Sequence, residues 1–386
     1  MMAIKKVVIN ICALLLIISV IPFLNIIGGL YYAAIAILFF IICSNIRYVQ
    51  INRCCLLFLL ICSFSIVFND IPSEIKPYQR FLLYFIIYIV FGPLFYNEKT
   101  NQLRLNIFFL LIKFCVIITL VSILAFLIWG IGIDKKDLGF KGITGYSMMM
   151  APIAAISTFY LIYLLRFRHA KWAIFLILIS LFTMLIAGSR SALAAFLVSF
   201  LFSLFKESKR KFFRLVLISI PILVISFPLW KSQLAVFEKK QEIQERMDDG
   251  ENSRTIKWNN RLYEFKNNPI IGVGFSSLDI RHSAGDYSKS EGTLEPGSSW
   301  LALLSMTGIL GFFSFFCLYF ISVKDYLMNK LKSHLDILVF QLLVFFGLHF
   351  IFEGYLFGIG SILLVIFLLS MSLSSRYTKI VLKCQQ

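Results

Sequence analysis

Long apolar runs recur along the whole chain, and they constrain its fold more than any other feature. A run of roughly 17–25 apolar residues can cross about 30 Å of hydrocarbon as a helix. Because every backbone amide must find a partner inside lipid, such runs predict helices rather than strands. Twelve runs reach or approach this length, at 7–23, 26–44, 54–69, 81–95, 106–130, 144–165, 172–187, 191–205, 213–230, 299–321, 335–352 and 357–374. The expected fold class is all-α: a polytopic membrane protein of about 12 transmembrane helices.

The composition excludes several other classes of protein. Hydrophobic residues make up 59% of the 386 residues and charged residues only 15%, whereas a soluble chain is roughly one quarter charged. This excludes an ordinary cytosolic enzyme, a disordered chain and a secreted disulfide scaffold. The eight cysteines lie in or beside apolar runs or in the C-terminal tail, so no disulfide framework is predicted. The His, Cys, Asp and Glu residues show no zinc-ligand spacing, and we expect neither a metal nor a cofactor.

The distribution of positive charge predicts the topology. The formal net charge is +17. With the N-terminus inside, the inner connections hold 20 basic residues, whereas the short outer connections hold six. Cytoplasmic loops carry such an excess of Lys and Arg, so both termini are predicted to be cytoplasmic. The first run follows Lys5 and Lys6 without a clear cleavage site, and we expect it to remain as an anchor. The excess charge is therefore a topological signal and predicts no nucleic-acid partner.

This topology divides the chain into three parts. Residues 1–230 hold helices 1 to 9, residues 231–298 form one large outer loop, and residues 299–386 hold helices 10 to 12 and a cytoplasmic tail. The loop differs in composition, because 231–297 contains ten basic and eleven acidic residues. Charged residues thus make up nearly a third of this loop, whereas the rest of the chain is sparsely charged.

Arg190 interrupts an otherwise apolar stretch of 31 residues at a predicted outer turn. A cation near the hydrocarbon is costly unless it meets water, an anion or a polar site. One interpretation is an arginine that extends to the interface as an anchor. The other is a ligand for a lipid-borne phosphate, which the guanidinium fork fits well.

The segment NSRTIKWNNRLYEFKNNPIIGVGF of the outer loop supplies two more candidate arginines. Arg254 and Trp258 are four residues apart, as are Arg261 and Phe265, which predicts one face of a short helix. Surface ion pairing is an equally good interpretation of both arginines. The GVG sequence at 272–274 is too short to indicate a phosphate loop and favours a tight turn that returns the chain to the membrane.

Few outward-facing residues could act as acid or base. They are His282, Glu291 and Glu295 in the loop, His349 near the outer end of the eleventh run, and Glu353 on the last outer connection. A carboxylate beside a membrane can have a raised pKa and serve as a base near neutrality. We expect His349, on an apolar helix, to be a packed histidine.

Three stretches together resemble one known family. They are SRSALAAFLVSFLF after the outer turn, then SRTIKW and NNPIIGVGF, then GSSWLALLSMTGILGFF. From about residue 185 to 315 the chain resembles the O-antigen ligase and polymerase superfamily (WaaL and Wzy types). This resemblance implies a multi-span glycosyltransferase of the bacterial inner membrane with one large periplasmic loop. Its substrate would be a glycan on undecaprenyl diphosphate, transferred to an acceptor sugar.

The resemblance also implies roles for individual residues. The arginines that bind the diphosphate would correspond to Arg190 and Arg254, with Arg261 as a third through its spacing to Gly272. Ligases of the family carry a His-Asn pair where this chain reads Gly297-Ser298. That departure removes the usual ligase base and favours the polymerase branch.

The base and the sugar contacts then fall on other residues of the loop and on the start of the tenth run. Glu295 and His282 are the expected substitutes for the missing base. Trp258, Tyr263 and Trp300 could stack on sugar faces, although anchoring at the membrane interface explains Trp300 equally well.

Physical reasoning independent of the family agrees with this picture. A loop outside the cytosol has no nucleotide sugars, so its donor must arrive on a lipid, and arginine could neutralise the departing diphosphate without a metal. The leading prediction is a polymerase of lipid-linked oligosaccharide repeat units. The alternatives are a ligase that moves finished glycan to a lipid-A core and, from another class, a transporter of lipid-linked oligosaccharide. The expected partners are the donor and acceptor glycans and membrane lipid, with a chain-length regulator of the Wzz type and a flippase as further candidates.

Overall fold

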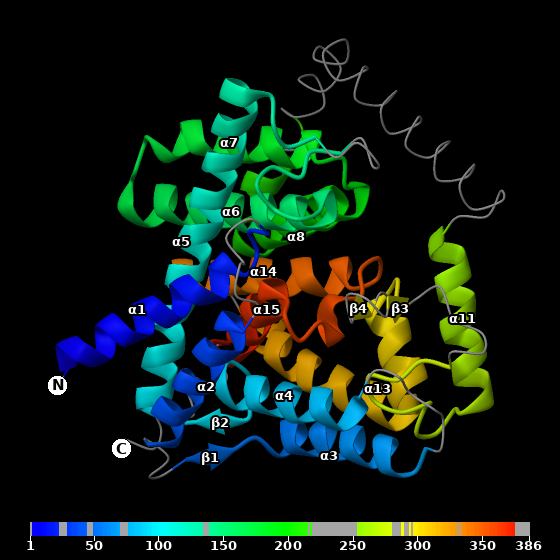
Figure 1. The fold of residues 1–386 in the computed structure, drawn as a ribbon. Helices are drawn as coiled ribbons and strands as arrows, with labels where there is room; N and C mark the ends of the chain where they lie inside the picture. Colours follow the sequence, from blue (N-terminus) through cyan, green and yellow to red (C-terminus); the bar gives the residue numbers. More distant parts are fainter. Residues whose placement is uncertain are drawn as a thin grey trace.

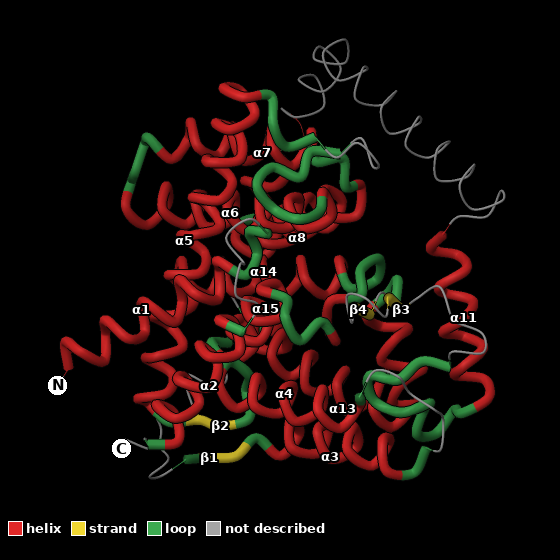
Figure 2. The backbone as a smooth tube through the Cα atoms, in the orientation of Figure 1, coloured by secondary structure: helices red, strands yellow, loops and turns green. Residues whose placement is uncertain are grey.

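The computed structural model describes residues 2–22, 29–44, 49–69, 76–133, 139–214, 217, 253–279, 287–288, 293–294, 296–329, 331 and 333–374. Figure 2 shows that helices make up most of this described chain. Most of the ninth predicted span, 213–230, lies outside the described residues, as do His282 and Glu295.

Each of the other eleven predicted spans contains an α-helix, which confirms the all-helical prediction. The helices are α1 (Met2–Ile18), α2 (Leu30–Cys43), α3 (Arg53–Val67), α4 (Pro77–Val90), α5 (Glu98–Trp129), α6 (Ser147–Arg168), α7 (Ala173–Ile186), α8 (Arg190–Glu207), α11 (Ser253–Asn267), α13 (Ser299–Met328), α14 (His334–His349), the 3₁₀ helix η2 (Tyr355–Phe357) and α15 (Ile362–Ser372). Two short antiparallel pairs join β1 (Gln50–Ile51) to β2 (Phe95–Tyr96) and β3 (Tyr287–Ser288) to β4 (Thr293–Leu294).

The apolar helices indicate a membrane protein. Within the described ranges, α5, α6 and α13 are long and apolar enough to cross a membrane, and seven further apolar helices have 10–17 residues. The number of helices that span the bilayer therefore remains a prediction.

The connections that the charge pattern predicts to be cytoplasmic contact one another. β1 pairs with β2, which joins the second connection to the fourth. Arg166, at the end of α6, pairs with Glu207 at the end of α8, and Lys206 donates to the carbonyl of Leu327 on α13. We call this end of the bundle the inner end.

The predicted outer connections also contact one another, at the opposite end. The Tyr31 hydroxyl donates to the Ile359 carbonyl over 2.8 Å. The Phe140 amide donates to the Ile186 carbonyl over 3.1 Å. We call this the outer end, and its contacts are those expected if successive helices alternate in direction.

The core surrounds α15, which is apolar on every side. All eleven of its residues, Ile362–Ser372, are buried. A helix that is hydrophobic all round belongs in the interior of a large protein. It packs against α5 and α14, and Figure 1 shows it near the middle of the bundle.

α13 is broken at Gly308, where φ is 62° and ψ is −168°. The break frees backbone groups on both sides, and the loop that follows α11 occupies it. Pro269 O accepts from Ile309 N over 2.9 Å, and Val273 N donates to Ser305 O over 2.8 Å. In a bilayer such groups must be satisfied by protein, so the inserted loop is what permits the break.

The inserted loop depends on glycine. Gly272 has φ +75°, and its carbonyl accepts from the Asn69 side chain over 2.8 Å. A Cβ on Gly272 would lie 2.4 Å from the Ser305 carbonyl oxygen, and one on Gly308 would lie 2.2 Å from the Ile270 carbonyl oxygen. The sequence predicts the tight turn at 272–274. There the chain bends at Val273 between two glycines of positive φ, and turns lie on either side at 269–271 and 275–276. The destination of this segment is the break in α13.

We therefore expect Gly308→Ala to destabilise the fold by more than about 2 kcal/mol, because it adds a backbone clash to a strained φ. Thermal unfolding of the detergent-purified protein measures this. Gly360→Ala is the matched control, since nothing lies within 4 Å of its added Cβ. Equal melting temperatures for the two variants would contradict the role of Gly308.

Candidate functional site

α11 has two distinct faces. Arg261 is fully buried, and Arg254, Trp258 and Phe265 on the same side of the helix are half-buried. Tyr263, on the opposite side, is 44% exposed. This confirms the predicted face of four residues that repeat at helical spacing. Arg254 and Arg261 therefore both lie on the face of α11 that packs against the protein.

α11 lies at the edge of the bundle, alongside α13 (Figure 1). The inserted loop fixes its C-terminal end. Trp258 fixes its middle, because the indole Nε1 donates to the Gly297 carbonyl over 3.3 Å and the ring packs against Phe352 at 6.3 Å between centroids. The helix is thus held across the outer end of the bundle.

Arg254 forms an ion pair with Glu353 at this end. The guanidinium Nη2 lies 2.9 Å from the Glu353 carboxylate, and the guanidinium carbon lies 6.0 Å from the centre of the Phe352 ring. The Arg254 side chain is 35% exposed and that of Glu353 is 17% exposed. A guanidinium at this site can therefore be reached from outside.

The backbone at Glu353 is held independently of this ion pair. Its carbonyl accepts from the Ser299 hydroxyl over 2.6 Å and from the Ser299 amide over 3.0 Å. A Cβ on Gly354 would lie 2.3 Å from the Pro296 ring, so the two segments pack closely. The start of α13 and the turn after α14 interlock here.

The ligases that the sequence resembles carry a His-Asn pair where this chain has Gly297 and Ser298, so Ser298 stands at the position of the asparagine. Its hydroxyl caps α13 by accepting from the Leu301 amide over 3.4 Å, and it donates to the Phe350 carbonyl over 3.2 Å. At this position the chain therefore has a helix cap, which is a common role for serine.

His349 lies beneath the site and shares a 2.9 Å hydrogen bond from its Nδ1 with the Tyr355 hydroxyl. His349 is 1% exposed and stacks on Phe345, which confirms the prediction of a packed histidine. Burial, together with the nearby Glu353 charge, raises the pKa of Tyr355 well above its usual range. Its hydroxyl therefore stays protonated and can serve the histidine as a hydrogen-bond donor.

Arg261 forms a second ion pair on α11, and this one is fully buried. Its Nη1 lies 3.0 Å from the Glu264 carboxylate, and both side chains are 0% exposed. The other Glu264 oxygen accepts from the Asp279 amide over 2.9 Å. The pair ties α11 to the end of the inserted loop, so a diphosphate could reach Arg261 only if this packing opened.

Arg190 begins α8 at the outer end. α8 and α14 are neighbours, since Ser199 Oγ donates to the Gln341 carbonyl. They run antiparallel, because Phe202 contacts Phe340 whereas Phe196, earlier in α8, and Phe345, later in α14, both contact Phe159. Arg190 is nine residues outward from Ser199, and His349 is eight residues outward from Gln341. At a rise of about 1.5 Å per residue, Arg190 and His349 therefore lie at about the same height along the two helices. Arg190 is exposed and lies at the same end as Arg254.

The predicted sugar-binding residues fall in three different environments. Trp258 packs beside Arg254. Trp300 donates its indole N–H to the Gly347 carbonyl over 2.9 Å and packs edge-on against Phe315, which is a packing role. Tyr263 belongs to a surface groove of about 430 Å³, whose lining consists of Asn259, Asn260, Leu262, Tyr263 and Lys266.

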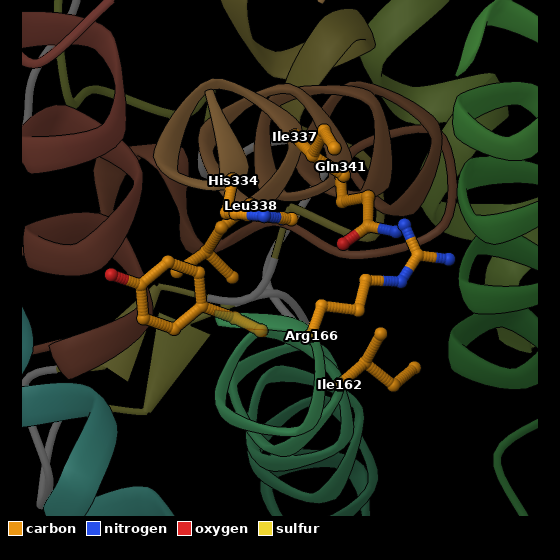
Figure 3. A pocket seen from close by; sticks show the side chains of 7 residues that line it. Ile162, Arg166, His334, Ile337, Leu338 and Gln341 are labelled. Carbon is orange, nitrogen blue, oxygen red and sulfur yellow. The ribbon is translucent and has the colours of Figure 1, made fainter. Parts of the chain in front are cut away.

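A separate small cavity lies at the inner end, between α6 and α14 (Figure 3). Its lining consists of Ile162, Tyr163, Arg166, His334, Ile337, Leu338 and Gln341. Its volume is about 10 Å³, which is room for no more than one water molecule. It is too small to hold a sugar, and it lies at the opposite end from Arg254.

The structure shows no group of three or more His, Cys, Asp or Glu able to hold a metal ion among the residues that it describes. At the outer end Arg254 on α11 pairs with Glu353 in the turn after α14, and Arg190 begins α8. Either guanidinium can bind an anion with several oxygens.

Comparison with known proteins agrees with the family resemblance that the sequence motifs indicate. A family model described as O-antigen ligase matches residues 173–316. This range runs from α7 through α8 and α11 into α13, and it includes Arg190 and Arg254. The match supports the O-antigen ligase and polymerase superfamily. No curated protein matches the chain significantly. The match supports a role in the assembly of O-antigen or another surface polysaccharide, and it does not separate polymerase from ligase.

The glutamate partners of the two arginines on α11 were not assigned from the sequence. Glu353 was only one of five outward-facing candidates, and it lies 99 residues from Arg254. Glu264, three residues after Arg261, carries a local signal, because charges at this spacing meet on one helix face. Nothing in the sequence indicated that Glu264 would be completely buried.

We expect Arg261→Met to destabilise the protein by about 3–5 kcal/mol, because it leaves the Glu264 carboxylate buried without its partner. The double variant Arg261→Met, Glu264→Met should recover part of this loss. Thermal unfolding measures both, with Lys266→Ala on the exposed face as the control. A melting temperature for Arg261→Met equal to that of the control would show that the buried pair is not structural.

Proposed function

We propose that this protein is a glycosyltransferase that polymerises undecaprenyl-diphosphate-linked repeat units on the periplasmic side of the bacterial inner membrane. The observation that carries the proposal is Arg254, half-buried beside Trp258 at the outer end, at the same end as Arg190. The product would be O-antigen or a related surface polysaccharide.

The arginines suit the leaving group of this reaction. As the glycosidic bond to the carrier breaks, negative charge builds on the departing diphosphate. A guanidinium presents a planar fork of donors to phosphate oxygens and keeps its charge at any physiological pH. Arg190 and Arg254 are the proposed ligands, and the burial of Arg261 favours a structural role for that residue.

The transfer itself is a displacement at the anomeric carbon. The acceptor hydroxyl oxygen forms the new bond, the bond to the diphosphate breaks with its electron pair, and a base takes the hydroxyl proton. Glu295 and His282 remain the proposed bases. Pro296, the residue after Glu295, packs on Gly354 next to Glu353, which makes Glu295 the first of the two to test.

Two aromatic residues are proposed to contact the sugars. Trp258 lies beside Arg254 and would pack on the sugar nearest the diphosphate. Tyr263 would stack on a more distant sugar in the α11 groove, where the Asn259 and Asn260 amides can both donate and accept hydrogen bonds. A chain-length regulator and a flippase are proposed partners.

A ligase is the second candidate function, and the description of the matching family favours it. Against it stands Gly297-Ser298, because Gly297 has no side chain to act as the ligase base and Ser298 caps α13. Loss of the gene separates the two. A polymerase strain should keep single repeat units on its lipid anchor, whereas a ligase strain should accumulate long polymer on undecaprenyl diphosphate. Normal long chains on the final acceptor would contradict both.

We expect Arg190→Ala and Arg254→Ala each to lower glycan transfer at least about 100-fold, because each removes a donor to the developing diphosphate charge. The measurement is the length distribution of lipid-linked glycan in cells that produce each variant, with membrane levels determined by immunoblot. Arg168→Ala, an exposed arginine at the inner end, is the matched control. Normal polymer from either variant at normal membrane levels would remove that arginine from the site.

A further inference from the structure

We propose that Glu353 is a place-holder, whose carboxylate occupies Arg254 until a lipid diphosphate displaces it. The inference rests on the proposed function and concerns the same site. It assigns to Glu353 control over how tightly substrate and product are held.

The geometry of the pair suits an exchange of anions. The Glu353 carboxylate lies 2.9 Å from Arg254, which is where a phosphate oxygen would lie in a charge-assisted hydrogen bond. The Arg254 side chain is 35% exposed and that of Glu353 is 17% exposed, so an anion from outside can reach the guanidinium and compete for it. A diphosphate brings more negative charge and more acceptor oxygens than one carboxylate, and it therefore displaces Glu353.

The backbone at Glu353 is held through its carbonyl, which accepts the two hydrogen bonds from Ser299. These two bonds do not involve the carboxylate, so they persist when the carboxylate exchanges with another anion. The pair of Arg261 and Glu264 on the same helix differs in burial, because both of its side chains are 0% exposed.

The place-holder matters most for product release. After transfer, the undecaprenyl diphosphate keeps its full negative charge and its contact with the arginines. Return of the Glu353 carboxylate to Arg254 competes with the product and speeds its departure. Glu353 would thus weaken ground-state binding in exchange for turnover.

The test measures binding of farnesyl diphosphate to the full-length protein in detergent, by calorimetry or by the fluorescence of its tryptophans. We expect Glu353→Gln to bind about 3- to 10-fold more tightly than the unaltered protein, and to show both a lower KM and a lower kcat in glycan transfer. Arg254→Ala should lose most of the binding.

Glu207→Gln is the matched control, because it removes the carboxylate of the Arg166 ion pair at the inner end. Its affinity for farnesyl diphosphate should equal that of the unaltered protein. Equal or weaker binding by Glu353→Gln would overturn the place-holder, and lost turnover with unchanged affinity would instead make Glu353 a base. If the unaltered protein failed to bind farnesyl diphosphate, the proposed function itself would fail and the inference with it.

Discussion

Backbone groups freed inside a membrane protein must find partners within the protein, and this requirement organises the outer end of the molecule. α13 breaks at Gly308, and the loop at 269–274 supplies hydrogen-bond partners on both sides of the break. The same loop continues directly from α11. Satisfying the broken helix therefore also fixes the helix that carries Arg254. The position of Arg254, a candidate site residue on the hydrophilic loop, therefore depends on the hydrogen bonds that the broken helix α13 requires.

Burial separates the roles of two arginines that the sequence treats alike. Both lie on one face of α11, and each pairs with a glutamate. The Arg261 pair is 0% exposed and ties the loop to the helix, whereas Arg254 is 35% exposed and available to an anion. A buried charge that loses its partner is costly, while a partly exposed one can exchange partners. The exposed pair is therefore suited to binding and release, and the buried pair to holding the fold.

Much of the architecture was predictable because it depends on local patterns. Apolar length predicted the helices, spacing by four residues predicted the inward face of α11, and GVG predicted a turn. The destination of that turn was not predictable, because the break in α13 appears only when the two segments meet. Arg104 shows the same limit. Arg104 is one of the 20 basic residues assigned to the inner connections, yet it is fully buried. It donates hydrogen bonds to the carbonyls of Ile89, Val90 and Phe95, and two of these are carbonyls at the end of α4.

The sequence by itself determined the helical class, the two ends of the bundle and the arginines worth testing. These follow from the length of apolar runs and the distribution of charge, and both are properties of neighbouring residues. Only the tertiary structure decided that Glu353 pairs with Arg254 and that the ion pair of Arg261 and Glu264 is buried. It also decided that Ser298 caps α13. These contacts join residues far apart in the chain or depend on burial. Burial is a property of the packed molecule, because it is set by what surrounds a side chain and not by its neighbours in sequence.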